Sequence, residues 1–484
     1  MEMNKEITEL KPEKVFKYFA EILQIPRPSK KEGKIIAYLI NWAEQRKLDV
    51  QNDQIGNVII RKSATKGYET KPWVCLQSHM DMVCEKNSDK VFDFEKDPIE
   101  AYVEDGWLKA KGTTLGADDG IGMAIALAIL DSDDIEHGNL ECLFTVDEET
   151  GLSGAEALSA DALKSRILIN LDSEDEGELF IGCAGGKDTL AKLPYETEPS
   201  PKGIAYKITV NGAKGGHSGD DINKGLANAN KVLNRILWTL NKEMEYALAS
   251  FEGGNLRNAI AREANAVVVV SKDDSQQMIS MVEQYNDDIR FEFRSTEPNL
   301  KVRIEEIETP KEVLDSMTQE DLLNLLYAIP HGVLSMSREI PNFVETSTNL
   351  ASIKMIDNCF VISTSQRSSI ETAKEAACDR NEACFLLVGA DVSHGDGYPG
   401  WAPNPDSKIL KVAEQSYERL FGKKPIVRAI HAGLECGLIG EKYKGMDMIS
   451  FGPTLRGVHS PDEKLEIKTV QLCWEHTLDI LRNV

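Results

Sequence analysis

The sequence has no long uninterrupted apolar run. Nowhere does it approach the ~18 consecutive apolar residues that a membrane-spanning helix requires. Its opening segment, "MEMNKEITELKPEKV", is charged and lacks the apolar centre of a signal peptide. We therefore expect a soluble protein of the cytoplasm with no membrane partner.

Positive charge is also scarce. The chain carries 55 Lys and Arg against 79 Asp and Glu, a net charge of −24. Nucleic acids and anionic membrane surfaces attract basic patches, so we expect neither as a partner. The nine cysteines are scattered and none forms a CxxC pair. This pattern argues against a cysteine metal cage and is typical of reduced thiols in a cytoplasm.

The first part of the chain has the pattern of an α/β protein. "PWVCLQS", "LECLFTV" and "SRILINLDSED" are apolar runs suited to buried strands, and helical patterns alternate with them. This order predicts a mostly parallel central sheet with helices on both faces. Sites in such sheets form at the carboxyl ends of the strands, where His79, Glu148, Glu149 and Asp172 lie.

The middle of the chain has a different pattern, which predicts a separate α+β layer. Partly alternating apolar residues favour strands, and amphipathic spacing favours helices. The predicted strands are "IAYKITVNG", "AVVVVS", "IRFEF", "VRIEEIE", "CFVISTS" and "CFLLVGA", and the predicted helices cover 222–240, 311–328 and 369–383. The Gly- and Pro-rich residues 394–406 read as a linker, after which an α/β pattern resumes.

Histidine and carboxylate residues at several strand ends have the chemistry of a site for two metal ions. Such hydrolase sites place imidazole and carboxylate ligands around ions ~3.5–4 Å apart, with a base close by. The candidate ligands are His79, Asp118, Glu149, Asp172 and His459. We expect Asp118 to bridge the ions, Glu148 to be the general base, and Asp81 to orient the ring of His79.

Each of these residues taken alone has a simpler interpretation. His79 fits a structural polar residue, and the Asp118–Asp119 pair fits a helix N-cap. Glu148 and Glu149 fit a solvated strand end. The metal interpretation depends on finding all of them in one chain.

The motifs together resemble a known family. "SHMDMV", "GTTLGADDGIGMA", "TVDEETGLSGA", "INLDSED", "GAKGGHSGDDI" and "RGVHSPDE" are similar, in this order, to motifs of the di-zinc aminoacylase/carboxypeptidase metallopeptidases. Within that family the chain looks most like the bacterial aminoacyl-histidine dipeptidases. The resemblance implies the same ligands, base and orienting aspartate as the residue chemistry does. It also implies a cis peptide bond between Asp118 and Asp119.

The resemblance further implies residues that bind substrate. His217, in "GGHSGDD", would hold the oxyanion, in some relatives from across a dimer. Arg367 would grip the substrate carboxylate, a task suited to a bidentate guanidinium. Asn349, His431 and Glu435 are weaker candidates for lining the pocket.

The ligand set determines the domain organisation that we expect. Because ligands come from residues 79–172 and from His459, residues 1–186 and 398–484 should form one discontinuous metallopeptidase domain. Residues 187–397 should then be an inserted lid and dimerisation domain, and we expect a homodimer.

The expected function is hydrolysis of dipeptides with a free C-terminal carboxylate, such as Xaa-His or β-Ala-His. A hydroxide bridging two zinc ions would attack, with Co²⁺ or Mn²⁺ able to replace zinc. Two alternatives stay open: an N-acyl-amino-acid deacylase of the same fold, and a metal-binding scaffold without activity. The intact Glu148 counts against the scaffold, which needs ligands but no base.

Overall fold

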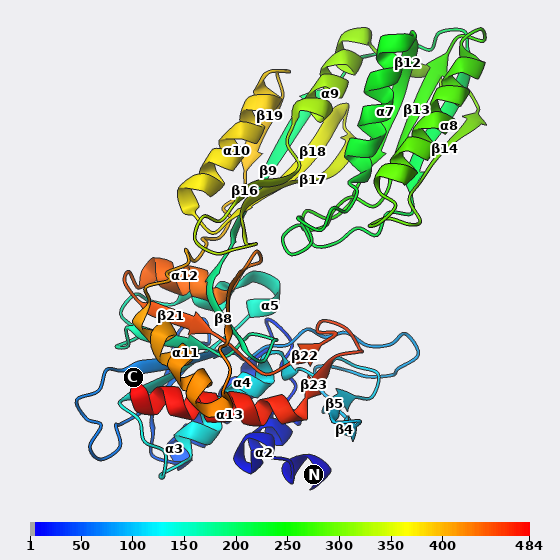
Figure 1. Ribbon diagram of the computed structural model, residues 1–484. Helices are drawn as coiled ribbons and strands as arrows, with labels where there is room; N and C mark the ends of the chain where they lie inside the picture. Colours follow the sequence, from blue (N-terminus) through cyan, green and yellow to red (C-terminus); the bar gives the residue numbers. More distant parts are fainter. Residues whose placement is uncertain (1–4) are drawn as a thin grey trace. The chain divides into compact units, whose positions relative to one another are not determined.

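Residues 5–484 are described by a computed structural model, in which the chain forms two units (Figure 1). Unit 1 comprises the described residues up to Gly182, with Trp401–Ala429 and Leu434–Val484; unit 2 comprises Cys183–Gly400 and Ile430–Gly433. The sequence assigned 430–433 to the first domain. In the structure this segment belongs to unit 2, because the amide of Ala184 donates to the carbonyls of Ile430 and Ala432.

The main sheet of unit 1 has parallel strands at its centre. Its strands, in spatial order, are β1 (Asp49–Asn52), β2 (Val58–Lys62), β6 (Leu140–Thr145), β3 (Val74–His79), β7 (Ile167–Asn170), β21 (Asp447–Ser450), β8 (Glu178–Cys183) and β20 (Ile426–Ile430). The pairs β6–β3, β3–β7 and β7–β21 are parallel, whereas β1–β2, β2–β6 and β21–β8 are antiparallel. All residues of β3 and β6 are buried, as expected for central strands that are apolar on both faces.

Helices and a small second sheet complete unit 1. Helix α4 packs against β3 and α2, and α11 packs against β21 and α13. The helices are α1 (Lys5–Thr8), α2 (Glu13–Ile22), α3 (Gly33–Gln45), α4 (Ala117–Leu130), α5 (Glu148–Gly151), α6 (Ser153–Ala157), α11 (Lys408–Phe421), α12 (Glu435–Lys442) and α13 (Ile467–Asn483). The small sheet has the order β22 (Leu455–Arg456), β23 (Lys464–Glu466), β5 (Trp107–Ala110) and β4 (Ala101–Glu104).

Unit 2 is built on one large sheet with helices on one face. The strand order is β14 (Lys301–Ile307), β11 (Ile204–Asn211), β13 (Ala264–Val270), β12 (Tyr246–Gly253), β17 (Val344–Ile356), β18 (Cys359–Ser368), β9 (Gly185–Pro194) and β19 (Asp391–His394), with β16 (Gly332–Met336) paired to β17. A separate pair joins β10 (Thr197–Pro199) to β15 (Glu312–Leu314). The helices are α7 (Ala229–Glu243), α8 (Ser275–Glu292), α9 (Ser316–Ala328) and α10 (Glu371–Leu386).

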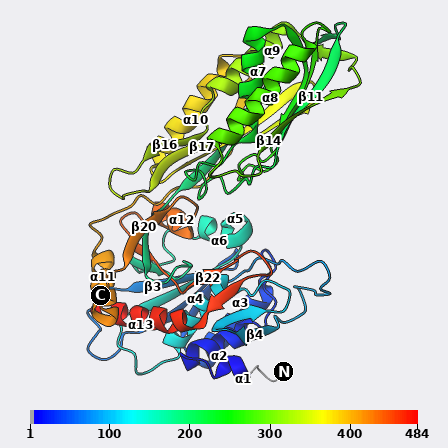
Figure 2. The same cartoon turned by 45° about the vertical axis from the view of Figure 1, so that its right-hand side comes forward.

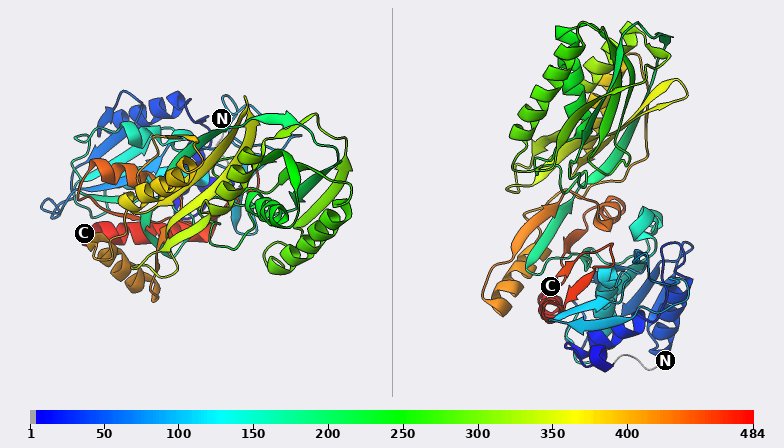
Figure 3. Two further views of the ribbon diagram at one scale, coloured as in Figure 1. Left: turned by 90° about the horizontal axis from the view of Figure 1, so that it is seen from above. Right: turned by 90° about the vertical axis from the view of Figure 1, so that its right-hand side faces the viewer.

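A single apolar core joins this sheet to its four helices. Tyr206, Ile208 and Val210 alternate along β11 into that core, and Leu233 of α7 and Met278 of α8 meet them there. Figures 2 and 3 show α7 and α8 side by side on that face.

Three of the expected elements of unit 2 differ most from the structure. The helix expected at 222–240 begins only at Ala229, because the Asn228 side chain caps it and Gly225, at φ 69°, turns the chain before it. "IRFEF" is the end of α8, whose buried Met278, Val282 and Ile289 follow a helical period rather than the alternation of a strand.

The third error is "CFLLVGA", which forms the last turn of α10 and the loop after it. Gly389, at φ 71°, lies in that loop, and Leu386 and Leu387 are exposed.

Within residues 5–484, no helix combines the length and the apolar character that crossing a membrane would need.

Candidate active site

Asp118 is shared between two clusters of potential metal ligands in unit 1. One cluster joins it to His79 and Asp172, and the other to Glu149 and His459; within each cluster the ligand atoms lie within 4.8 Å of one another. The Oδ1 atom of Asp118 lies 3.1 Å from Nε2 of His79, and its Oδ2 atom lies 3.3 Å from Nε2 of His459. One carboxylate therefore presents one oxygen to each imidazole.

The chain brings these residues together through the topology of the sheet. His79 ends β3, while Glu149 and Asp172 follow the neighbouring strands β6 and β7. Because these strands are parallel, their carboxyl ends lie at one edge of the sheet. Asp118 lies in the first turn of α4, where its peptide bond to Asp119 is cis, which confirms that prediction.

Asp81 connects His79 to the loop of the two glutamates. Its Oδ1 atom lies 3.4 Å from Nδ1 of His79, and its carboxylate accepts hydrogen bonds from the amides of Glu148 and Glu149. The hydroxyl of Ser29 also donates to it. Although burial alone would raise it, these contacts lower the pKa of Asp81 to about 2, so the side chain is an anion at neutral pH.

Glu148 lies beside the shared carboxylate without belonging to either Asp118 cluster. It forms a third group with His79 and Glu149, again with ligand atoms within 4.8 Å. Burial and the nearby carboxylates of Asp172 and Glu435 raise the pKa of Glu148 well above its ordinary value. Such a carboxyl group is suited to accepting and returning a proton.

The charges at this edge of the sheet are strongly coupled. Hydrogen bonds from the two histidines hold the pKa of Asp118 well below its ordinary value, despite burial. The carboxylates of Asp118 and Glu149 in turn raise the pKa of His459 to about 11. The Oε1 atom of Glu149 is buried and has no hydrogen-bond partner within residues 5–484. Two imidazoles, three carboxylates and an unpartnered buried oxygen match the ligand preferences of two divalent cations.

A second cluster, in unit 2, contains His217 and Arg367. The Nδ1 atom of His217 accepts hydrogen bonds from the amides of Gly219 and Asp220, so it carries no proton. Burial, and then the positive charge of Arg367, lower the pKa of His217. The neutral ring therefore bears its proton on Nε2, which lies 3.4 Å from Nη2 of Arg367.

Arg367 is held by two residues that the sequence did not reveal as functional. Its Nη1 atom donates to the hydroxyl of Tyr398 at 2.9 Å, and its Nε atom to that of Ser218 at 3.3 Å. Tyr398 lies in the Gly- and Pro-rich segment that we interpreted as a linker, where nothing in the sequence marks a site. Ser218 directly follows His217, and its position was the only available signal.

Asn349 and His431 lie in the same unit-2 cluster. Asn349 donates to the carbonyl of Ala259 at 2.8 Å, and its Oδ1 atom is buried without a partner in the described chain. Nε2 of His431 lies 2.7 Å from the hydroxyl of Ser347. Burial, followed by the charge of Arg367, lowers the pKa of His431 to about 3, so its ring is neutral.

Glu435, the remaining candidate for lining the pocket, lies in unit 1. Its side chain is fully buried in unit 1, where its carboxylate accepts hydrogen bonds from Gln77 of β3 and Thr145 of β6. Burial raises the pKa of Glu435 to about 7. The Oε1 atom of Glu435 is buried without a hydrogen-bond partner in the described chain, and its role in lining the pocket stays a prediction.

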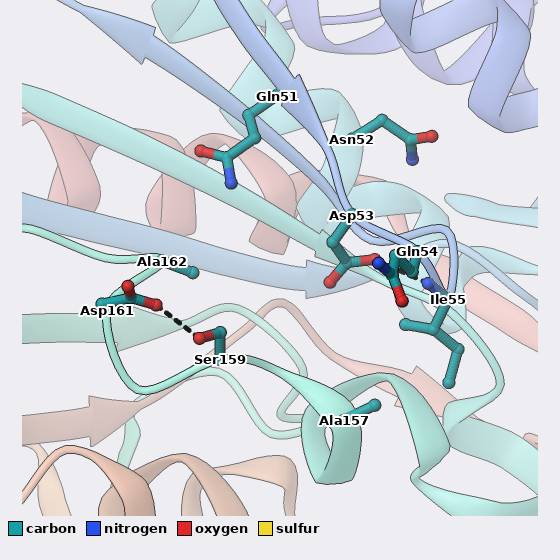
Figure 4. Close-up of a pocket in the computed structure, with 9 residues that line it drawn as sticks. All are labelled: Gln51, Asn52, Asp53, Gln54, Ile55, Ala157, Ser159, Asp161 and Ala162. Atoms are coloured by element: carbon teal, nitrogen blue, oxygen red, sulfur yellow. Dashed lines mark hydrogen bonds between the residues drawn. The ribbon is translucent and has the colours of Figure 1, made fainter.

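A separate pocket of about 780 Å³ in unit 1 contains neither ligand cluster (Figure 4). Its two carboxylates already have partners: Asp53 accepts from backbone amides of the turn that follows it, and Asp161 accepts from Ser159. Both carboxylates of this pocket are therefore already engaged in local hydrogen bonds.

Comparison with known proteins gives a matching family and relatives that cover nearly the whole chain. The family described as Peptidase family M20/M25/M40 matches residues 75–483. The cytosol non-specific dipeptidase of Escherichia coli (strain K12) is 42% identical over 480 residues, which cover 99% of each chain. The crystal structure of aminoacylhistidine dipeptidase from Vibrio alginolyticus superposes with a TM-score of 0.92 at 42% identity, and the match covers 99% of this chain and 98% of that one.

More distant solved structures share the fold. An aminopeptidase from Bacillus cereus ATCC 10987 matches with a TM-score of 0.57 at 18% identity, covering 98% of both chains. At this identity the match supports the fold alone.

Proposed function

Because the chain belongs to peptidase family M20/M25/M40, we propose that it is a dipeptidase that uses two divalent metal ions. Its substrates are dipeptides with a free C-terminal carboxylate, including Xaa-His and β-Ala-His. The main support for this proposal is that two ligand clusters share the carboxylate of Asp118 and that Glu148 lies next to them. The full-length similarity to two dipeptidases supports the substrate class.

The five ligand candidates would hold the ions as two sets that share one member. His79 and Asp172 would serve one ion, Glu149 and His459 would serve the other, and Asp118 would serve both. When bound, the ions supply Lewis acidity that polarises the scissile carbonyl and makes a water molecule more acidic. Zinc suits a set of imidazole and carboxylate ligands, and Co²⁺ or Mn²⁺ accept the same ligands.

The side chains of the protein carry the proton and position the substrate. Glu148 takes a proton from the attacking water and passes it to the leaving amine. Asp81 holds both the His79 ring and the backbone that presents Glu148. In unit 2, Nε2–H of His217 donates to the oxyanion, while the guanidinium of Arg367 binds the substrate carboxylate.

Location and assembly complete the proposal. We place the protein in the cytoplasm, which is supported by the name of the Escherichia coli relative and by the scattered cysteines of the sequence, none of which forms a CxxC pair. We also propose a homodimer, which rests on the family resemblance. Sedimentation analysis tests it: a mass twice the 53.7 kDa of one chain supports a dimer, and a mass of one chain contradicts it.

A substrate panel tests the function directly. The panel contains β-Ala-His, other Xaa-His dipeptides, dipeptides without histidine, tripeptides and acetylated amino acids, each assayed with Zn²⁺, Co²⁺ and Mn²⁺. We expect hydrolysis of the dipeptides and little hydrolysis of the acetylated amino acids. The reverse preference would indicate a deacylase, and no hydrolysis at all would indicate a scaffold.

A further inference from the structure

Two buried, oppositely charged side chains hold the turn that carries Asp118. The turn comprises residues 115–118, directly before and within the start of α4. Arg27 contacts it from one segment of the chain and Glu463 from another, and each is only 2% exposed. The mechanism above uses neither residue.

Glu463 binds the turn through its backbone amides. Its Oε2 atom accepts from the amides of Leu115 at 2.7 Å and Gly116 at 2.9 Å. Its Oε1 atom accepts from those of Ala117 at 2.8 Å and Asp118 at 3.3 Å. One carboxylate thus fixes four consecutive peptide units, which leaves the turn little freedom to move.

Arg27 binds the same turn through a carbonyl and joins it to the segment after His79. Its Nη2 atom donates to the carbonyl of Gly116, while its Nη1 atom donates to the carbonyls of Met80 at 3.0 Å and Asp81 at 2.6 Å. The planar guanidinium therefore links the turn of Asp118 to the segment that directly follows His79.

The position of Arg27 explains why two residues of "GADDGIG", Gly116 and Gly120, are glycines. A Cβ atom on either Gly116 or Gly120 would lie 2.7 Å from Nη2 of Arg27. Gly116 also adopts φ 70°, which favours glycine. The local sequence thus leaves space for the arginine.

The two side chains together connect three of the ligand-bearing segments. Glu463 lies in the same C-terminal segment as His459, and Arg27 bonds to the two residues that follow His79. Burying a guanidinium and a carboxylate costs solvation energy, which apolar residues of the same volume would not incur. Their presence next to Asp118 is explained if they set its position relative to the two histidines.

We propose that Arg27 and Glu463 are positioning residues that hold the Asp118 carboxylate between His79 and His459 and so set the spacing of the two metal ions. This inference rests on the proposed function, because it requires that Asp118 binds both ions. Neither residue touches an ion or the substrate, and both act through the backbone of the turn.

The test uses Arg27→Lys and Glu463→Gln in the full-length protein, purified with metal present. Lysine keeps the charge but cannot bond to two loops in one plane, and glutamine offers one acceptor oxygen instead of two. We expect metal affinity, measured by competition with a chelator, to fall by roughly 10- to 100-fold, the usual effect of changing a residue that supports metal ligands. The visible absorption of the Co²⁺-loaded protein should change as well.

Arg61→Lys and Glu141→Gln are matched controls in unit 1. These residues form a largely buried pair on β2 and β6, with side chains 11% and 0% exposed. Glu141 also accepts from the amides of Lys164 and Ser165, as Glu463 does from those of the turn. The controls should lower the melting temperature in chelator and leave metal affinity and the Co²⁺ spectrum unchanged.

The outcomes separate this inference from the proposed function. If both variants have the same metal affinity and the same Co²⁺ spectrum as the unmutated protein, the inference is overturned and the proposed function is not. Variants that fail to fold even with metal present would also overturn it, by assigning the pair a general structural role. A lack of metal binding by the unmutated protein would overturn the proposed function together with the inference.

Discussion

The Nε2 atom of His217 and the Nη2 atom of Arg367 lie 3.4 Å apart, and both are hydrogen-bond donors. His217 is a donor at this atom because its other ring nitrogen accepts from two backbone amides. Two donors cannot satisfy each other, so both stay available to acceptors of a bound ligand, such as the oxyanion and the carboxylate of a dipeptide.

Replacing Arg367 should remove recognition of the substrate carboxylate. For Arg367→Ala we expect kcat/KM for dipeptides to fall by roughly 10- to 100-fold, the effect of losing a charge-assisted hydrogen bond. Amidated dipeptides should be poor substrates of the unmutated protein. Their kcat/KM should not fall further in the variant. Arg257→Ala, which alters an exposed arginine of the same unit, is the control. Equal turnover of free and amidated dipeptides by the unmutated protein would remove this role.

His217 and Arg367 should act on the same substrate molecule, because they are neighbours in one unit. A mixture of His217→Ala and Arg367→Ala chains should therefore show no more activity than the two variants measured apart. Each chain in such a mixture still has an incomplete cluster, whatever the assembly. Recovery of activity in subunits shown by mass to have exchanged would mean that the two groups serve different sites.

Glu148 and Glu149 should have separable roles. Glu148→Gln should lower kcat by at least ~10²-fold, the scale of a general base, and keep two ions per chain. Glu149→Gln should lose metal affinity as well, since Glu149 belongs to the cluster of Asp118 and His459. Elemental analysis of both variants measures the number of metal ions per chain. Loss of metal from the first variant and not from the second would reverse the two assignments.

His476 should make the protein less stable in acid. Its Nε2 atom donates to the carbonyl of Ala413, and burial lowers the pKa of His476 from 6.5 to about 4. The unfolded chain therefore takes up a proton first as the pH falls. The contribution of neutral His476 to the free energy of unfolding is fully present above pH 6.5. It is lost as the pH falls towards 4, by up to about 3 kcal/mol for this shift.

Denaturant unfolding between pH 7 and pH 4 measures this effect. His476→Gln keeps a donor for the carbonyl but cannot be protonated, so its free energy of unfolding should depend less on pH. His394→Gln, at an exposed residue of β19, is the control for the same substitution elsewhere in the chain. Parallel pH dependence of His476→Gln and the unmutated protein would contradict the assignment.

The sequence predicted the parallel centre of unit 1 because its buried strands are continuous apolar runs that end in polar residues. Parallel strands also bring their carboxyl ends together, so His79, Glu149 and Asp172 were expected at one edge, although only the family resemblance selects Asp172 from its acidic run. In unit 2 the sequence was less informative. "IRFEF" has the alternation of a strand, but the helical spacing of earlier residues in α8 determines its structure.

Residues that act through long-range contacts could not be predicted. Arg27 reads as an ordinary residue in a polar loop, and its buried position depends on carbonyls at residues 80, 81 and 116. Tyr398 is in the same situation, since only the folded chain brings its hydroxyl to Arg367. Local patterns contain no information about such pairs.

The requirement for two metal ions tests the account most directly. Protein stripped with a chelator, and shown by elemental analysis to be free of metal, should not hydrolyse β-Ala-His or other dipeptides, and activity should return as Zn²⁺ is added back to two ions per chain. An Asp118→Asn variant, which removes the shared carboxylate, should recover neither full occupancy nor activity. Full activity in the metal-free protein would contradict the account.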